Sequence, residues 1–307
     1  MKTMCLLFAL VFFATSSNST TAAPADGFVD VADHVSIHYL QSGQANAPHT
    51  LLLIPGWRIS SSIWDKQITY FTTLGYRVIA IDSRSQGESS VVTEGNAPEN
   101  RATDIQQVIA RLDLKHVVMI GWSQGAQDVA AYVSRYGTNA VDALVLVDSP
   151  VSTGPDDVSE NPGFLNTILK GIATYSRDPR GYSDGMMHAI ISTPTPSTVY
   201  AQLVEEALKT PSDIGISMLI QDMFSVDRRT ALKQFSKPTL VIASGRSPLL
   251  EEQRNMLKTL PQGKFLVVAD AAHAVFFDQP DVFNHDLATF IESIDAQRSQ
   301  SVRRNSP

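Results

Sequence analysis

The sequence is poor in cysteine and in charge, and it lacks the patterns that hold metals or phosphates. Its one cysteine is Cys5, so the chain cannot form an internal disulfide. Charged residues make up 18% and hydrophobic residues 43%, which is the composition of a globular protein rather than a disordered one. We find no His/Cys cluster with metal-ligand spacing and no glycine-rich phosphate loop, so no cofactor is expected.

The N-terminus has the three parts of a secretory signal peptide. Met1-Lys2 gives a positive start, residues 5–14 form an apolar run, and a polar stretch ends at Ala23-Pro24-Ala25. The run is too short to span a bilayer, which needs about 20 apolar residues, so a membrane anchor is the weaker alternative. We predict that residues 1–25 are removed and that a secreted or periplasmic protein begins at Asp26.

Removal of this segment changes the charge and the redox chemistry of the chain. Cys5 and Lys2 leave with it, so 23 basic residues face 31 acidic ones and the net charge is −8. An acidic protein is a poor ligand for nucleic acid or for an anionic membrane surface, and neither is expected as a partner. Without a cysteine, the mature protein depends on packing for its stability.

Short apolar strands alternate with helices along the rest of the chain. Residues 28–39 alternate in polarity like a half-buried hairpin, and the later strands are continuous apolar runs, typical of strands buried on both faces. These strands are predicted at 50–54, 77–81, 117–120, 143–147, 238–243 and 264–268. The intervening helices are predicted at 61–74, 103–112, 251–260 and 282–294. The alternation predicts an α/β fold with a mostly parallel sheet covered on both faces.

The regular alternation is interrupted after Asp148-Ser149-Pro150. Residues 151–229 are rich in Pro, Gly, Ser and Asp and contain short helical pieces, as at 164–175 and 199–208, so we predict a helical cap inserted above the sheet. The core then consists of residues 26–150 and 230–296. Residues 297–307, with three arginines, are predicted to form a flexible tail.

The stretch Gly121-Trp122-Ser123-Gln124-Gly125 joins a predicted strand to a predicted helix. A strand, a Gly-x-Ser-x-Gly turn and a helix form the context of a serine-nucleophile elbow. The two glycines allow strand and helix to crowd together while Ser123 takes a strained conformation with its hydroxyl exposed. An ordinary strand-to-helix turn explains one glycine well and two poorly, so we predict Ser123 as a nucleophile.

Together with other motifs, this stretch resembles the α/β-hydrolase superfamily, especially its esterase and cofactor-free haloperoxidase-like branch. Leu53-Ile54-Pro55-Gly56-Trp57 is similar to that branch's oxyanion turn, and residues 75–89 are similar to its second parallel stretch. Asp270-Ala271-Ala272-His273-Ala274 is similar to its histidine loop. The resemblance covers nearly all of the mature chain and implies no cofactor.

A serine hydroxyl needs a base that takes its proton and an acid that fixes the tautomer of that base. His273, after the last strand, is the predicted base. The family usually places the acid after the strand that ends here at Ala243, but Ser244-Gly245 stands there. We therefore predict Asp148, at the end of the preceding strand, with Glu251 as the alternative. The other histidines are interpreted as structural or surface residues: His34, His38, His49, His116, His188 and His285.

The oxyanion of a tetrahedral intermediate needs donors that are already in place. The resemblance implies that these are the backbone N–H groups of Trp57 and Gln124. The family often has histidine where Pro55 stands, which matters little because the donor comes from the residue after Gly56.

Serine at the elbow argues against dehalogenases and epoxide hydrolases, which use an aspartate nucleophile in this superfamily. We predict hydrolysis of a small-to-medium, uncharged carboxylic ester or lactone through an acyl-enzyme on Ser123. Apolar cap residues are expected to pack on the core or to line the pocket: Met186, Met187, Ile190, Ile191, Ile216, Met218, Leu219, Met223 and Phe224. Two alternatives stay open: acyl transfer to hydrogen peroxide, as in a perhydrolase or haloperoxidase, and a non-catalytic binding protein with a hydrolase pocket.

Overall fold

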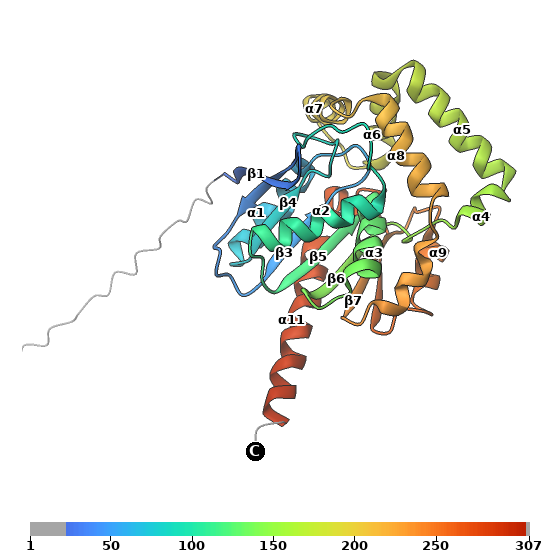
Figure 1. The fold of residues 1–307 in the computed structure, drawn as a ribbon. Helices are drawn as coiled ribbons and strands as arrows, with labels where there is room; N and C mark the ends of the chain where they lie inside the picture. The colour runs from blue at the N-terminus through green and yellow to red at the C-terminus, as the bar shows by residue number, and fades with distance from the viewer. Residues whose placement is uncertain (1–22, 305–307) are drawn as a thin grey trace, which may run out of the picture.

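A computed structural model of the chain describes residues 23–304, so most of the predicted signal peptide lies outside the described residues. Eight strands form one sheet in the order β1-β2-β4-β3-β5-β6-β7-β8 (Figure 1). The first two strands form the predicted hairpin, and the pairs from β4 through β8 are all parallel. The bounds are β1 Ala25–Ala32, β2 Val35–Ser42, β3 Thr50–Ile54, β4 Arg77–Ile81, β5 Val117–Trp122, β6 Val141–Val147, β7 Thr239–Ser244 and β8 Gly263–Val268. The predicted α/β fold with a mostly parallel sheet is confirmed.

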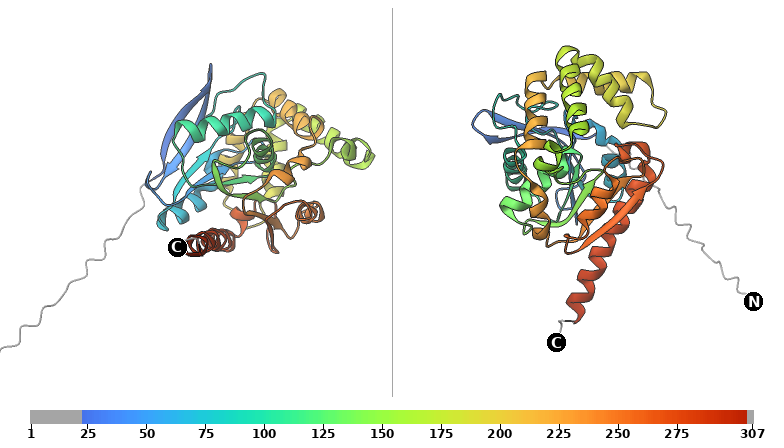
Figure 2. Two further views of the ribbon diagram at one scale, coloured as in Figure 1. Left: turned by 60° about the horizontal axis from the view of Figure 1, so that its bottom comes forward. Right: turned by 90° about the vertical axis from the view of Figure 1, so that its right-hand side faces the viewer.

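Helices cover both faces of the sheet, which is why its central strands are apolar over most of their length (Figure 2). Successive side chains of a strand point to opposite faces. In β3, Leu51 and Leu53 pack on one side with α1 and α11, whereas Leu52 and Ile54 pack on the other side with α2 and α3. These helices are α1 Asp65–Thr73, preceded by the 3-10 turn Ser61–Trp64, and α2 Pro98–Arg111, α3 Gln124–Tyr136 and α11 Pro280–Arg304.

Five helices lie between β6 and β7 and gather at one end of the molecule (Figures 1 and 2). We call this set the cap. Three of them begin with proline, whose fixed φ suits the first helical position and whose missing N–H costs nothing there. The helices are α4 Pro155–Ser159, α5 Pro162–Arg177, α6 Pro179–Ile190, α7 Ser197–Leu208 and α8 Ser212–Phe224, followed by the 3-10 segment Arg228–Gln234. Beyond β7 come α9 Leu250–Met256 and α10 Val275–Asp278.

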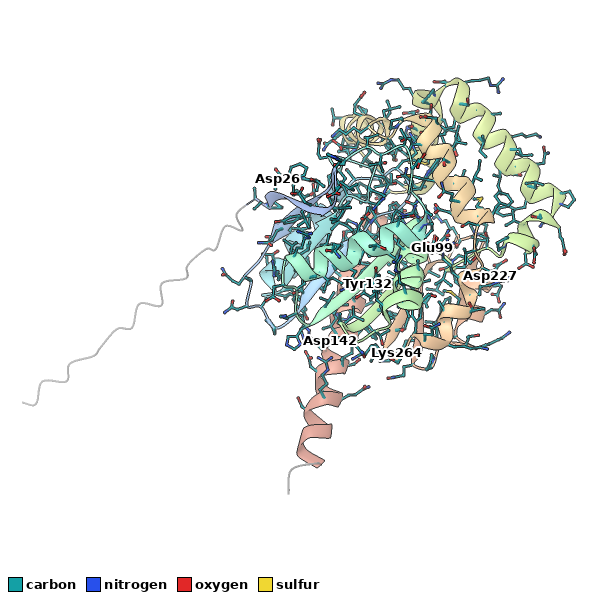
Figure 3. All side chains as sticks on the ribbon, in the orientation of Figure 1. Asp26, Glu99, Tyr132, Asp142, Asp227 and Lys264 are labelled. Carbon is teal, nitrogen blue, oxygen red and sulfur yellow. The ribbon has the colours of Figure 1, made fainter. Side chains whose placement is uncertain are left out.

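The C-terminal helix differs from the prediction of a flexible tail that begins at residue 297. Helix α11 continues to Arg304, and residues 305–307 lie outside the described part. Its sequence contains no glycine or proline after Pro280, so nothing in it ends the helix. Arg298 also donates to Asp142, which lies beside the lower half of α11 (Figure 3), at 2.7 Å. This ion pair anchors the helix where it leaves the core.

Candidate active site

Ser123 lies in a sharp turn between β5 and α3. Its φ of 56° and ψ of −118° are strained values for a residue with a side chain. The turn is tied to the sheet because the Ser123 N–H donates to the Val147 carbonyl at 3.1 Å. Such a turn exposes the hydroxyl at the carboxyl edge of the sheet, as a nucleophile elbow does.

The two glycines of the motif stand where no side chain fits. A Cβ on Gly121 would lie 2.3 Å from the Gly125 carbonyl oxygen, and one on Gly125 would lie 2.6 Å from the Ile54 carbonyl oxygen. Gly56 is also close, because its Cβ would lie 3.1 Å from the Ser123 Cβ. The elbow and the turn after β3 therefore pack backbone against backbone.

Gly121→Ala is expected to lower the free energy of unfolding by about 1–3 kcal/mol, because the added methyl group meets a carbonyl that cannot move away. Gly185→Ala is the matched control. Gly185 lies inside α6 with nothing within 4 Å of its Cβ position. Alanine there should be neutral or stabilising by up to about 1 kcal/mol. Denaturant unfolding of both variants measures the change in the free energy of unfolding. An equal change in the two variants would contradict the close packing around Gly121.

His273 bridges the serine and an aspartate. Its Nε2 lies 2.9 Å from the Ser123 Oγ, and its Nδ1 lies 2.8 Å from the Asp148 Oδ2. Its ring packs 5.3 Å from the Trp122 ring, and the Trp122 indole N–H donates to the His273 carbonyl at 2.9 Å. The structure thus brings together the three side chains predicted as nucleophile, base and acid.

Asp148 is buried, and its carboxylate is held on both oxygens. Its φ is 44°, another strained value, and only 1% of its side chain is exposed. While Oδ2 faces His273, Oδ1 accepts from the Ser244 N–H at 2.9 Å and from the Gln253 side-chain amide at 3.1 Å. Ser244 lies at the end of β7, where the family usually has its acid. Its backbone N–H therefore helps to hold Asp148, the acid predicted in place of the usual one.

Glu251, the alternative acid, is not brought to the histidine. It lies in the first turn of α9, its side chain is 74% exposed, and it pairs with Arg254 at 3.5 Å. Sequence reasoning missed Gln253, two residues further on. A glutamine in a short helix carries no sequence signal that separates it from a solvated residue.

The residues predicted to supply the oxyanion donors flank the serine. Trp57 follows Gly56 in the turn after β3, and Gln124 is the first residue of α3. Both direct their side chains away to the cap. The Trp57 indole N–H donates to the Gly215 carbonyl at 2.9 Å, and the Gln124 amide donates to the Asp222 Oδ2 at 2.5 Å.

A cavity of about 310 Å³ opens over the serine. Ser123 and His273 form part of its wall beside Gly56 and Trp57, and the rest is mostly apolar. Of the cap residues expected to pack or to line a pocket, four line this cavity: Met186, Ile190, Leu219 and Met223. Three others are buried in the packing of the cap: Met187, Ile191 and Met218. A cavity of this size is at the small end for ligand sites.

A buried charge cluster fixes the cap to the core behind the elbow. Arg101 of α2 donates to Asp128 of α3 at 2.8 Å and to Asp222 of α8 at 2.7 Å. One guanidinium thus faces two carboxylates, and within residues 23–304 the Asp128 Oδ2 has no hydrogen-bond partner. Burial, which outweighs the attraction of Arg101, raises the pKa of Asp128 to about 7.

The Asp128 proton gives folding a defined pH dependence. Between about pH 4 and pH 7 the folded protein keeps a proton that the unfolded chain has lost, so stability falls as pH rises through this window, by about 1.4 kcal/mol per pH unit. Asp128→Asn, which mimics the protonated acid, should remove this contribution. Urea unfolding of both proteins from pH 5 to pH 8 tests it: their difference should change with pH below 7 and level off above, and a constant difference would contradict the protonation.

Further features of the described residues concern membrane-spanning helices and metal sites. Across residues 23–304 there is no helix that is both long and apolar enough to cross a membrane. In the same residues no group of three or more His, Cys, Asp or Glu side chains is arranged to hold a metal ion.

A serine–histidine–aspartate array at the carboxyl edge of a mostly parallel sheet is the arrangement of the α/β hydrolases. The chain belongs to this family: the model of the alpha/beta hydrolase fold matches residues 49–280. It is 27% identical over 281 residues to a bifunctional esterase/perhydrolase of Acinetobacter calcoaceticus, covering 87% of this chain and 100% of the relative. It is 28% identical over 284 residues to a non-heme chloroperoxidase of Burkholderia pyrrocinia, covering 87% and 99%.

Solved structures agree on the fold. A bromoperoxidase from Bacillus anthracis superposes with a TM-score of 0.79 at 22% identity, covering 87% of this chain and 100% of that one. An esterase from Exiguobacterium antarcticum gives 0.77 at 21% identity, covering 86% and 98%.

Proposed function

We propose that this α/β hydrolase is a serine esterase that cleaves small-to-medium, uncharged carboxylic esters or lactones through an acyl-enzyme on Ser123. The observation that carries the proposal is the hydrogen-bonded chain from Ser123 through His273 to Asp148, which opens onto an apolar cavity. The esterase activity named for one relative supports the same reaction class.

The proposed reaction has two half-steps. His273 Nε2 takes the proton of the Ser123 hydroxyl as its oxygen attacks the ester carbonyl, and the resulting oxyanion accepts from the Trp57 and Gln124 N–H groups. His273 then gives the proton to the departing alkoxide, which leaves as the alcohol. In the second step water attacks the acyl-enzyme, His273 takes its proton and returns it to the serine, and the carboxylic acid is released. Asp148 stabilises the imidazolium at each stage.

The cavity supports the proposed substrate class. Its volume of about 310 Å³ limits the substrate to a small or medium molecule, and its wall residues Ile59, Ile168, Met186, Leu219 and Met223 offer no charge to a substrate. A charged acyl group would lose its hydration without a partner, which is costly in an apolar site. Neutral esters and lactones are therefore favoured.

A fluorophosphonate probe tests the class of the protein. It should label the wild type covalently on Ser123, and labelling should vanish in Ser123→Ala while circular dichroism stays unchanged. Hydrolysis of p-nitrophenyl esters of graded chain length and of simple lactones should follow the same pattern. An unlabelled wild type that cleaves none of them would overturn the esterase and favour a non-catalytic binding protein.

A second reaction is favoured by the perhydrolase activity named for one relative. Hydrogen peroxide in place of water would attack the acyl-enzyme and release a peracid. Peracid formation from a short carboxylic ester and hydrogen peroxide, lost in Ser123→Ala, would support it. Hydrolysis without any peracid would exclude it.

We also propose that the protein is exported and begins at Asp26. The proposal rests on the signal-peptide pattern of residues 1–25, and the contacts of Asp26 are consistent with cleavage there. Asp26 lies at the start of the sheet (Figure 3), and its carboxylate accepts from His38 at 2.9 Å, while Asp82 lies on the other ring nitrogen at 2.8 Å. Cleavage before Asp26 would remove Ala25, the first residue of β1, and leave this contact intact. N-terminal sequencing of the exported protein checks the site, and a cytoplasmic, uncleaved protein would contradict it.

A further inference from the structure

Helix α8 of the cap contacts both turns that carry the proposed oxyanion donors. The Gly215 carbonyl accepts from the Trp57 indole N–H at 2.9 Å, and the Asp222 carboxylate accepts from the Gln124 amide at 2.5 Å. Gly215 and Asp222 are seven residues apart, which is about two helical turns, so both lie on the same side of α8. One helix thus contacts both Trp57, in the turn after β3, and Gln124, at the start of α3.

This helix is firmly seated. Asp222 is buried and its second oxygen accepts from Arg101, a residue of the core helix α2, at 2.7 Å. At the other end α8 approaches so closely that a Cβ on Gly215 would lie 2.7 Å from the Tyr175 hydroxyl and 3.1 Å from the Arg58 Cδ. Helix α8 is therefore packed closely at both of the positions from which it contacts Trp57 and Gln124.

The same helix also forms part of the cavity wall. Leu219 and Met223 of α8 line the cavity over Ser123. Leu219 lies between Gly215 and Asp222, and Met223 directly follows Asp222. The helix that contacts the donor-bearing turns therefore also lines the space over Ser123.

We propose that α8 positions the oxyanion hole, with the Gly215 carbonyl and Asp222 as positioning groups. This inference rests on the proposed esterase function. Oxyanion donors act mainly in the transition state, so loosening them should lower kcat and leave KM nearly unchanged. Complete loss of one donor costs about 10²–10³ in kcat, and misplacement should cost less, about 10- to 100-fold.

Two conservative variants remove the contacts but keep the backbone N–H groups. Gln124→Met deletes the amide that reaches Asp222, and Trp57→Phe deletes the indole N–H that reaches Gly215. Each should lower kcat for a p-nitrophenyl ester by about 10- to 100-fold, and the inhibition constant of an alkylboronic acid, whose serine adduct places an oxygen in the same hole, should rise by a similar factor. Gln124 does not line the cavity, so its variant should leave KM within about twofold.

The control makes the same change elsewhere on α8. Gln221 bonds only Ser217 of the same helix, at 2.8 Å, among the interactions described for its side-chain amide. Gln221→Met should leave kcat and the boronic acid constant unchanged. Equal kcat in Gln124→Met, Trp57→Phe and the wild type would overturn the proposal, as would a loss confined to KM.

Amide hydrogen exchange gives a readout that needs no activity. In both variants the peptides that contain residues 56–58 and 123–126 should exchange faster than in the wild type, while Gln221→Met should match it. If the wild type shows neither esterase activity nor probe labelling, the proposed function is refuted, and this result requires no variant. Unchanged exchange in an active, correctly folded variant refutes the positioning role alone.

Discussion

Asp148→Asn is expected to lower kcat by about 10⁴-fold while leaving the fold intact, the size found for the same change in another serine–histidine–aspartate triad. The reason lies in how the carboxylate is held. Oδ1 accepts from the Ser244 N–H and from the Gln253 amide, so an asparagine must keep its carbonyl oxygen there. Its NH₂ group then faces the His273 Nδ1.

This orientation reverses the tautomer of the histidine. A donor opposite Nδ1 requires Nδ1 to be the acceptor, which moves the ring proton to Nε2, the atom that faces Ser123. A protonated Nε2 cannot take the proton of the serine hydroxyl. Steady-state ester hydrolysis and the rate of fluorophosphonate labelling should therefore fall together, and the thermal unfolding midpoint should change little.

Glu251→Gln is the matched control, since it makes the same chemical change at the other candidate acid. Glu251 is exposed on α9 and pairs with Arg254, so activity should stay within about twofold. Near-normal turnover in Asp148→Asn, or a large loss in Glu251→Gln, would overturn the assignment of the acid.

The sheet could be predicted well because its signals are local. The predicted runs 50–54 and 77–81 coincide with β3 and β4, since a strand buried on both faces forms a nearly continuous apolar run. Asp148 could also be placed, because the ends of neighbouring parallel strands meet at one edge. The hydrogen bond from the Ser244 N–H to Asp148 could not be predicted, since it joins residues that are 96 positions apart in the sequence.

The cap and the buried polar groups carry weaker signals. Helix α8 has apolar residues around most of its circumference, because one side packs on the core and another lines the cavity, so no single apolar stripe marks it. Arg101 and Asp128 lie within amphipathic helices, where charged residues are normally solvated. Only the arrangement of α2, α3 and α8 in space shows that these charges meet inside the protein.

Arg101→Met is expected to lower the free energy of unfolding by about 3–5 kcal/mol, the cost of leaving a buried charge without its partner. Arg101 is 1% exposed and supplies Asp222 and Asp128 with their shared cation. Among the described residues, the Gln124 amide is then the remaining hydrogen-bond donor to the Asp222 carboxylate. Denaturant unfolding at pH 8, above the pKa of about 7 of Asp128, measures the loss.

The same variant makes a second, pH-dependent prediction. Without the Arg101 guanidinium, burial favours the protonated form of Asp128 still more strongly, so the loss of stability should be smaller at pH 5 than at pH 8. Arg180→Met is the control, because Arg180 pairs with Glu205 on the cap surface, where both side chains are exposed. That variant should lose at most about 1 kcal/mol, with little dependence on pH. Equal losses in the two variants would contradict a buried, charge-balanced link between cap and core.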